Sequence, residues 1–376
     1  GATNATLTNA TVGNLTASGV VSLTNADTGW IKDAASVSMA DASTVTGDIT
    51  MAETNTGVTM DHSTLQGSII GAVGATLENA SLVTGNLDLA GGAATIKAST
   101  VHGTITGADT VTVSAGSTVG NISEVSGKVD IDDSTTGNIA TSGDVELTNA
   151  HSGTISGTDV SLSGGSSSGA ITATGTVGVE DSTVNGTISG TDVTVTGGSA
   201  SGAITASGMA TVDGSTVEGT ITAGGLVDLD NATVGNVQTD GEVELAGSHA
   251  GTIGGTNVSL EAGSSSGAIT ASGTVGVDAS TVEGTISGAT SLEMSNGAVV
   301  NGDVSMADGN TGVTMDGSTI HGSISNAGKL EITNQSMVTG NVELVGDAEL
   351  SISDSTVAGT VSGAKSVELT NTSTGD

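Results

Sequence analysis

A glycine that recurs every 16 to 20 residues is the feature that most constrains what this chain can fold into. Two positions after nearly every such glycine stands Ile, Leu or Val, as in Gly186 with Ile188 and Gly202 with Ile204. These marker glycines are at positions 13, 29, 47, 67, 85, 103, 120, 137, 153, 169, 186, 202, 219, 235, 251, 267, 284, 302, 322, 340, 359 and 375. A short period held over a whole chain predicts a repeat architecture, in which stacked units complete a core that no single unit can bury.

The residues inside each unit favour strands over helices. Apolar residues alternate with polar ones, as in Val129 and Ile131 or Val243 and Leu245, and this is the period of a strand. Thr, Val and Ile fill these short runs, while Gly, Asn, Asp and Ser lie between them. The sequence therefore predicts an all-β fold, a single-stranded parallel β-helix or β-solenoid of about 22 coils of 16 to 20 residues.

Composition supports one continuous solenoid over residues 1–376, with 1–12 as a partial first coil and 366–376 as a partial last coil. The chain has 60 Gly and no Pro, Phe, Tyr or Cys. Proline would remove a ladder hydrogen bond, and a thin core has little room for aromatic rings. There is no initiating Met, signal peptide or transmembrane run, so we expect a mature or excised segment.

Two internal duplications favour a structural role over an enzymatic one. Residues 153–190 are nearly copied in 251–288, and residues 47–67 are nearly copied in 302–322 with the same 20-residue spacing. Duplicated blocks of different size suggest a solenoid lengthened by copying, whereas the site of an enzyme occurs once. We expect no enzymatic activity, because the five His are dispersed and no catalytic constellation is recognisable.

The charge balance limits the partners that we expect. Formal net charge is −35, with 40 acidic residues, five Lys and no Arg. Such a chain is not expected to bind nucleic acid or an anionic membrane. The balance suits an extracellular or cell-surface protein that avoids nonspecific association.

Many acidic residues occupy the outward position between two apolar residues. Asp130 with Glu146, and Asp228 with Glu244, fall on successive coils and are the candidate ligands for a metal, Ca²⁺ being the expected cofactor if there is one. The alternative is a solvated acidic face, which we favour because the Gly-Gly-x-Gly-x-Asp calcium repeat is absent. Glu293, Glu331 and Glu368 occupy the same position on other coils.

Ice binding is a minor alternative. Flat Thr rows on β-solenoids are typical of ice-binding proteins, but the Thr194 and Thr196 pair is not continued as a Thr-x-Thr row on the coils beside it.

The repeat unit resembles that of the bactofilins, a polymer-forming cytoskeletal family. The pattern is V-x-G-x-I followed by an apolar pair, as in Val217, Gly219 and Ile221 with Val227 and Leu229, and it covers nearly the whole chain. The resemblance implies a right-handed β-helix that polymerises end to end into nonpolar filaments without a nucleotide. The length, the scarcity of Lys and Arg and the abundance of Ser and Thr are more similar to secreted bacterial or archaeal surface proteins, such as adhesin passengers and S-layer or filament subunits.

We therefore expect an extracellular structural subunit of a filament, fibre or surface layer, a homopolymer joined head to tail at its end coils. The alternative is the stalk or passenger region of an adhesin, and a calcium-dependent matrix protein is a minor one. Trp30 is either a surface ring over a coil corner or an anchor at a subunit contact. The candidate self-assembly residues are Gly1, Ala2, Thr3, Leu7, Trp30, Val367, Leu369, Gly375 and Asp376. Glycan modification is possible at sequons that begin at Asn4, Asn9 and Asn231.

Overall fold

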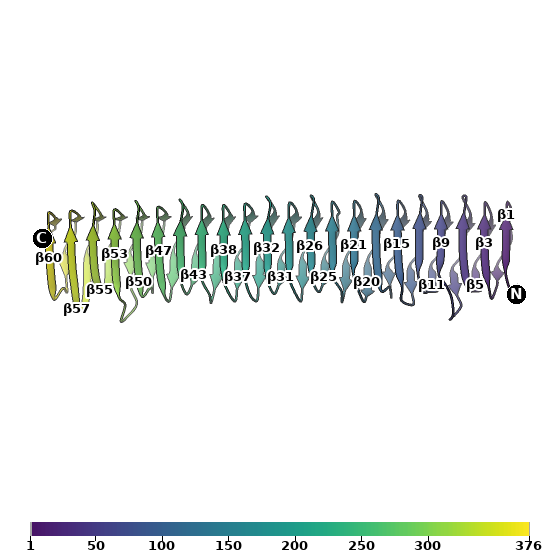
Figure 1. The fold of residues 1–376 in the computed structure, drawn as a ribbon, viewed down its shortest axis with the longest axis horizontal. Coiled ribbons are helices and arrows are strands. Elements are labelled where there is room, and N and C mark those ends of the chain that lie inside the picture. Colours follow the sequence, from purple (N-terminus) through teal and green to yellow (C-terminus); the bar gives the residue numbers. More distant parts are fainter. Residues whose placement is uncertain (1, 376) are drawn as a thin grey trace. The chain divides into compact units, whose positions relative to one another are not determined.

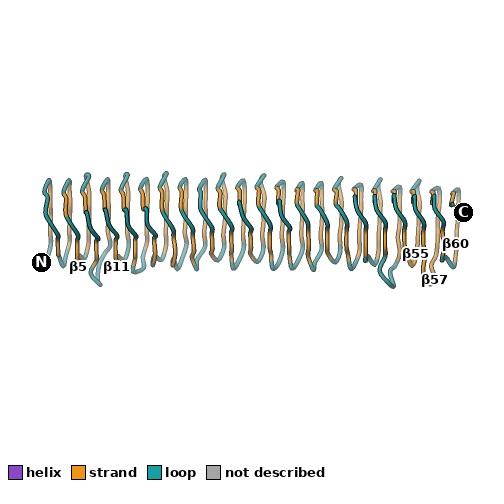
Figure 2. The backbone as a smooth tube through the Cα atoms, turned by 180° about the vertical axis from the view of Figure 1, so that it is seen from behind, coloured by secondary structure: helices purple, strands orange, loops and turns teal. Residues whose placement is uncertain are grey.

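The computed structural model describes residues 2–375, and within them every regular element is a β-strand. The chain divides into two compact units, Gly1–Gly190 and Thr191–Asp376, which are described separately below. Both are parallel β-solenoids, and together they have about 22 turns, which confirms the predicted fold class. Figure 2 shows only strand and loop colours along the described chain.

The turns of the first unit stack into three rows of parallel strands, and at Thr11 and His151 the third row is an isolated bridge (Figure 1). The first row follows the marker glycines: β2 (Leu15–Thr16), β5 (Ile31–Ala34), β8 (Ile49–Met51), β11 (Ile69–Ala72), β14 (Leu87–Leu89), β17 (Ile105–Thr106), β20 (Ile122–Val125), β23 (Ile139–Thr141), β25 (Ile155–Gly157), β28 (Ile171–Ala173) and β31 (Ile188–Gly190). The second row holds the longer strands: β1 (Ala5–Thr8), β3 (Val20–Thr24), β6 (Ser36–Ala40), β9 (Val58–Asp61), β12 (Ala75–Glu78), β15 (Ala93–Lys97), β18 (Thr110–Ser114), β21 (Val129–Asp132), β24 (Val145–Thr148), β26 (Val160–Ser163) and β29 (Val177–Glu180). The third row holds two-residue strands: β4 (Asp27–Thr28), β7 (Thr44–Val45), β10 (Thr64–Leu65), β13 (Leu82–Val83), β16 (Thr100–Val101), β19 (Thr118–Val119), β22 (Thr135–Thr136), β27 (Ser167–Ser168) and β30 (Thr183–Val184).

The second unit has the same three rows. Its first row is β34 (Ile204–Ala206), β37 (Ile221–Ala223), β40 (Val237–Thr239), β43 (Ile253–Gly255), β46 (Ile269–Ala271), β49 (Ile286–Ser287), β52 (Val304–Ser305) and β59 (Val361–Ser362), and β55 (Ile324–Thr333) and β57 (Val342–Ser353) run through the first and second rows. Its second row is completed by β32 (Val193–Thr196), β35 (Ala210–Asp213), β38 (Val227–Asp230), β41 (Val243–Ala246), β44 (Val258–Glu261), β47 (Thr274–Asp278), β50 (Ser291–Ser295), β53 (Gly312–Asp316) and β60 (Ser366–Thr370). Its third row is β33 (Ala200–Ser201), β36 (Thr216–Val217), β39 (Thr233–Val234), β42 (His249–Ala250), β45 (Ser265–Ser266), β48 (Thr281–Val282), β51 (Val299–Val300), β54 (Thr319–Ile320), β56 (Met337–Val338), β58 (Thr356–Val357) and β61 (Ser373–Thr374).

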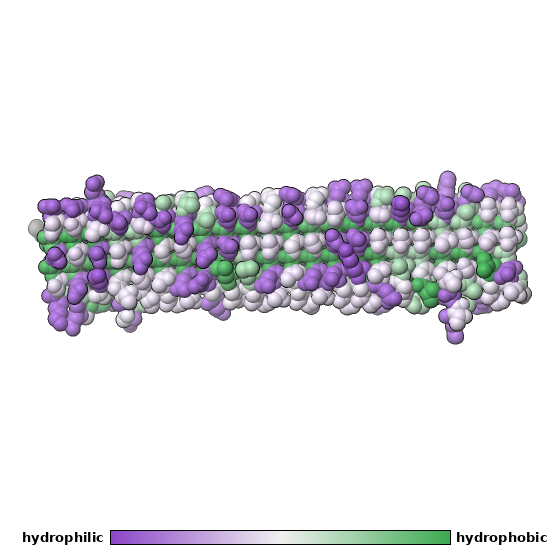
Figure 3. Space-filling view, viewed as in Figure 1, coloured by the Kyte–Doolittle hydropathy of each residue, from purple (hydrophilic) through white to green (hydrophobic). Residues whose placement is uncertain are grey.

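Strands in each row stack in register, so equivalent residues of successive turns form ladders. In the first unit Val129 pairs with Val145 and Ile131 with Leu147, and all four side chains are buried. The residues between them point outward because side chains alternate along a strand. On the face drawn in Figure 3, pale and green rows accordingly alternate along the strands of both units, and strongly hydrophilic side chains occur in separate clusters.

The marker glycines are required by close contact with the preceding turn. A Cβ added at Gly103 would lie 2.3 Å from the carbonyl oxygen of Gly85 and 2.6 Å from its carbonyl carbon. The φ of Gly103 is not in the left-handed region, so steric contact and not backbone conformation selects glycine here. The same contact recurs at Gly120, where an added Cβ would lie 2.3 Å from the oxygen of Gly103.

A ladder of buried serines lines the corner before the third row. In the first unit Ser99 N donates to Ser117 Oγ, Ser117 N donates to Ser134 Oγ, and both distances are 3.1 Å. The hydroxyls of Ser99 and Ser117 also donate to carbonyls of their own turns, to Lys97 O at 2.8 Å and to Ser114 O at 2.6 Å. Every buried hydroxyl thus has partners inside the core, which is the condition for burying a polar group without a large penalty.

The two 20-residue repeats, which begin at Gly47 and Gly302, accommodate their extra residues in a corner. In the loop after β8, Asn55 Nδ2 donates to Ala52 O and Gly71 O, and Asn55 Oδ1 accepts from Val73 N. In the second unit Asn310 Nδ2 donates to Ala307 O and Asn326 O. Strand register on either side is kept, as in Ile49 with Ile69, so the longer corner leaves the ladders intact.

Candidate functional site

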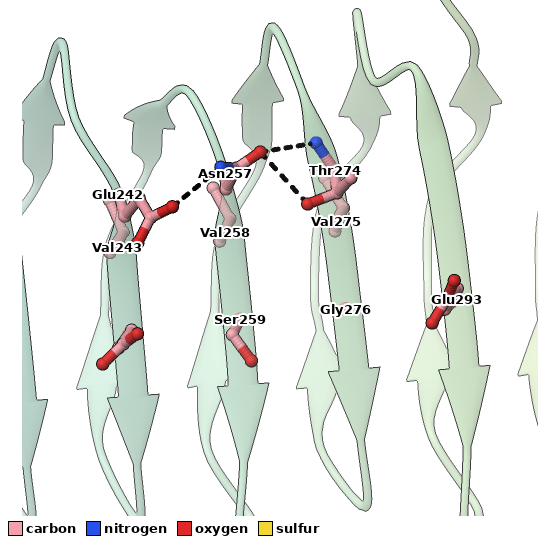
Figure 4. A pocket seen from close by; sticks show the side chains of 10 residues that line it. Glu242, Val243, Asn257, Val258, Ser259, Thr274, Val275, Gly276 and Glu293 are labelled. Atoms are coloured by element: carbon pink, nitrogen blue, oxygen red, sulfur yellow. Dashed lines mark hydrogen bonds between the residues drawn. The ribbon is translucent and has the colours of Figure 1, made fainter. Parts of the chain in front are cut away.

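A surface groove of the second unit lies on the outer face of its second strand row (Figure 4). Four successive strands, β41, β44, β47 and β50, supply its residues, and its volume is about 310 Å³. The lining residues are Glu242, Val243, Glu244, Asn257, Val258, Ser259, Thr274, Val275, Gly276 and Glu293.

Gly276 forms the floor of this groove. It lies between Val275 and Val277 on β47, in the outward position that most other turns fill with a side chain. A Cβ added there would have only Ser259 Oγ within 4 Å, at 3.8 Å, and φ is not in the left-handed region. Neither packing nor backbone conformation therefore demands glycine, and its missing side chain opens the groove.

A chain of hydrogen bonds holds the upper rim. Asn257 Nδ2 donates to Glu242 Oε1 at 2.9 Å, and Thr274 donates from N and from Oγ1 to Asn257 Oδ1 at 2.9 and 3.1 Å (Figure 4). The rim therefore fixes the carboxylate of Glu242 and the hydroxyl of Thr274 two strand spacings apart, with Asn257 between them.

The charged residues that line the groove are all acidic, namely Glu242, Glu244 and Glu293. Glu244 and Glu293 flank Ser259 and Gly276 on the outward row, three strand spacings apart. At about 4.8 Å per spacing the two carboxylates are too far apart to coordinate one ion together.

The first unit contains the matching groove, shifted by the 98 residues of the duplication. It has a volume of about 410 Å³, with Gly178 in place of Gly276, Ser161 in place of Ser259 and Glu146 in place of Glu244. A Cβ on Gly178 would meet nothing within 4 Å. Lys128 lines this copy, whereas the equivalent residue of the other copy is Leu226.

The structure brings the predicted metal candidates together in pairs. Asp130 pairs in register with Glu146, and Asp228 with Glu244, as expected for successive turns. Lys128 Nζ lies 2.5 Å from Glu146 Oε2 and 3.8 Å from Asp130 Oδ2, so a cationic side chain already lies beside the first pair. The hydrogen bond to Glu146, together with the charges of Asp130 and Asp144, raises the pKa of Lys128.

Asp228 and Glu244 share a second groove, of about 200 Å³, with Glu261 and Ser259. Across residues 2–375 no three His, Asp or Glu side chains come close enough to hold a metal ion together. The calcium expectation therefore remains a prediction about this pair.

Each unit contains one histidine that contacts a serine of the next turn in the same way. His151 Nδ1 lies 2.7 Å from Ser167 Oγ, and His249 Nδ1 lies 2.6 Å from Ser265 Oγ on the next turn. Both pairs are exposed on the third row. Nucleophilic catalysis by such a pair requires a third group that orients the imidazole.

A threonine row in the first unit was not expected from the sequence. Thr59, Thr76, Thr95 and Thr112 pair in register on the outward side of the second row. The row is one residue wide, because Asp61, Glu78 and Lys97 occupy the next outward position on three of these strands. In the second unit Thr194 pairs with Thr211, and the row then continues as Asp228.

Side-chain hydrogen bonds link the corners of successive turns after the second row, and sequence reasoning missed them. We call such a contact a corner bond when an Asn Nδ2 donates to the Asn or Asp Oδ1 at the same corner of the preceding turn. Within residues 2–375 the structure contains the corner bonds Asn25 to Asn9, Asn79 to Asp61, Asn149 to Asp133, Asn296 to Asp278, Asn334 to Asp316 and Asn371 to Asp354. The sequence signal was Asn or Asp just before the serine ladder, and all six Asn donors adopt the left-handed conformation, which Asn tolerates.

One corner bond predicts a pH dependence. Asp278 Oδ1 accepts from Ser295 Oγ at 2.6 Å and from Asn296 Nδ2 at 2.5 Å, and these bonds lower the pKa of Asp278 although desolvation opposes them. A lowered folded-state pKa stabilises the fold above the unfolded-state pKa, and this contribution is lost as pH falls through the folded-state value. We expect Ser295→Ala to raise the pKa of Asp278, measured by a carboxyl-carbon NMR titration.

Ser291→Ala, at the other end of β50, is the matched control and should leave that pKa in place. An unchanged Asp278 titration in Ser295→Ala would show that the hydroxyl does not stabilise this carboxylate.

The candidate self-assembly residues lie in the end turns, apart from Trp30. Gly1 and Asp376 lie outside the described residues. Ala2 is bridged to Ala17 and is exposed, as is Thr3, while Leu7 on β1 is half-buried. Val367 and Leu369 on β60 are 56% and 50% exposed, and Gly375 N donates to Val357 O at 3.0 Å.

Trp30 is half-buried beside the buried Ile31. Lys32 Nζ lies 4.9 Å from the centroid of its ring, which is the geometry of a cation–π contact. The role of Trp30 at a subunit contact stays a prediction. Of the sequon residues, Asn4, Asn9 and Asn231 are all exposed.

Comparison with protein-family models, curated proteins and solved structures finds no match to this chain. No helix among the described residues has the length and apolar character needed to cross a membrane.

Proposed function

We propose that this protein is an extracellular structural subunit that assembles end to end by stacking solenoid turns. One observation carries the proposal. On the last described turn Val367 and Leu369 are 56% and 50% exposed, whereas the residues they stack on, Leu350 and Ile352, are 4% and 1% exposed. A further turn placed on β60 would bury this apolar pair.

The backbone of the end turn supports the same proposal. Strands β59 and β60 pair with β57 on one side, and β61 pairs with β58 on one side. Open strand edges of this kind bind added strands through main-chain hydrogen bonds. Because every turn is built alike, an added turn from a second copy would meet the same ladder that each turn meets within the chain.

Composition and the repeat pattern support the remaining parts of the proposal. A net charge of −35 without Arg suits an extracellular protein whose acidic surface repels polyanionic partners. The V-x-G-x-I unit resembles that of a family that polymerises end to end, and the duplicated blocks suit a repetitive structural element.

The experiment is negative-stain electron microscopy of the purified 376-residue protein, with sedimentation velocity over a range of concentrations. We expect filaments of uniform width and a sedimentation coefficient that rises with concentration. A stable monomer at every concentration would contradict the proposal and favour the alternative, a stalk of an adhesin. Repeating both measurements with millimolar calcium, and with sodium chloride at equal ionic strength, tests the carboxylate pairs, because a bound ion would make assembly depend on calcium beyond general charge screening.

A further inference from the structure

We propose, resting on the assembly proposed above, that the N-terminal turn of a second copy stacks on the C-terminal turn in the parallel direction. In this junction Ala5 and Leu7 cover Val367 and Leu369, Thr6 lies opposite Glu368, and Asn9 lies opposite Asn371. These pairs select a polar, head-to-tail contact over a contact between like ends.

The apolar pairs match a stacking arrangement that is already present between two turns of the chain. On β1 the inward residues are Ala5 and Leu7, and on β60 they are Val367 and Leu369. Within the first unit Ala75 and Leu77 stack in register on Val58 and Met60, and all four are at most 2% exposed. At the junction Ala5 would stack on Val367 and Leu7 on Leu369 in the same way, and both end pairs would be buried to a similar degree.

Charge distinguishes the two ends. Residues 2–26 contain no Asp, Glu, Lys or Arg. The last turns carry Glu343, Asp347, Glu349, Asp354 and Glu368, with Lys365 as their only nearby cation in the sequence. A contact between two C-terminal ends would bring these carboxylates together, and like charges opposite each other repel. Thr6 opposite Glu368 avoids this repulsion and repeats a pairing already present in the chain, that of Thr314 with Glu331.

The corner bonds give the contact its direction. In each of them the later turn donates and the earlier turn accepts, as Asn25 does to Asn9 at 2.7 Å and Asn371 does to Asp354 at 3.1 Å. Asn9 and Asn371 occupy the same kind of left-handed corner, with φ of 49° and 51°. Asn9 uses its Oδ1 and Asn371 its Nδ2 in these bonds, so the Nδ2 of Asn9 and the Oδ1 of Asn371 are the complementary atoms at the junction. A contact between like ends is two-fold symmetric and runs the two end strands antiparallel, so it would not join Asn9 to Asn371 or continue the donor-to-acceptor order.

Disulfide trapping tests the direction, because the wild-type chain has no cysteine. We would mix the Thr6→Cys and Glu368→Cys variants under mild oxidation and identify the cross-linked peptides by mass spectrometry. Adjacent parallel strands put opposed Cα atoms about 4.8 Å apart, within the range that a disulfide spans. We expect cross-links between Cys at 6 and Cys at 368, and none when Thr76→Cys, on β12 inside the first unit, replaces Thr6→Cys.

A charge variant measures the same contact without cross-linking. Thr6→Glu should weaken assembly roughly fivefold at low ionic strength, since it opposes two carboxylates across one strand spacing. Thr76→Glu adds the same charge inside the first unit and should have no such effect, and Thr6→Glu with Glu368→Gln should restore assembly.

The outcomes separate this inference from the proposed function. If the wild-type protein stays monomeric, the proposed function is contradicted and the junction with it. If it assembles but cross-links form between two Cys at 368 or two Cys at 6, assembly stands and the polar junction is overturned. Equal effects of Thr6→Glu and Thr76→Glu would also overturn it.

Discussion

Replacing Gly103 with alanine is expected to lower the free energy of unfolding by roughly 3 kcal/mol. The new methyl group would lie 2.3 Å from Gly85 O and 2.6 Å from Gly85 C, which are backbone atoms of the turn below. Gly103 N also donates to Gly85 O at 3.2 Å, so the two turns cannot separate without losing this bond. Urea denaturation followed by circular dichroism measures the loss, and hydrogen exchange should locate it in the turns around residues 85–120.

Gly178→Ala is the matched control for the same chemical change. The added methyl group meets nothing within 4 Å, and the residue lies inside β29. Glycine in a strand is destabilising relative to alanine by roughly 0.5–1 kcal/mol, so this variant should be as stable as the wild type or slightly more stable. If both variants lost the same stability, glycine would matter through backbone entropy and not through contact between turns.

Replacing Ser117 with alanine is expected to cost roughly 1–3 kcal/mol, which is the penalty for a buried donor left without a partner. Ser117 Oγ accepts from Ser99 N at 3.1 Å and donates to Ser114 O at 2.6 Å, and the side chain is 1% exposed. The variant removes the acceptor of the Ser99 amide without adding volume. Chemical denaturation measures the stability, and the exchange rate of the Ser99 amide should rise more than that of distant ladder amides.

Ala150→Ser is the complementary variant, because Ala150 occupies the same ladder in place of serine. A hydroxyl there would offer Ser134 N the acceptor that Ser117 Oγ offers Ser99 N. We expect this variant to be more stable than the wild type by up to about 1 kcal/mol. A gain from Ser117→Ala, or a loss from Ala150→Ser, would show that the ladder is tolerated and does not stabilise the core.

The sequence alone determined the fold class, because its two periods are local and independent of each other. Alternation of residues such as Val129 and Ile131 reports a strand, and the glycine spacing reports the length of a turn. Together they also placed Asp130 opposite Glu146 and Asp228 opposite Glu244, since counting along the period gives the register.

Only the tertiary structure decided how the turns contact one another. Gly103 looks like a turn glycine in the sequence, but the structure shows that a carbonyl of the previous turn excludes its Cβ. Gly276 is the opposite case, because the open space above it is visible only when β44 and β50 lie on either side. Both distinctions depend on distances between residues that are 16 to 20 positions apart.

The polar contacts were likewise hidden from the sequence. Serine before a Thr-Val pair reads as an ordinary corner residue, and only the stacked turns reveal that Ser99 and Ser117 bond to each other inside the core. Lys128 was not singled out, yet it lies within ion-pair distance of Asp130 on its own turn and of Glu146 on the next turn. Periodicity in a sequence fixes which residues meet, because backbone ladders repeat at a constant spacing. What those residues do when they meet depends on side-chain direction and on the free space between turns, which only the tertiary structure defines.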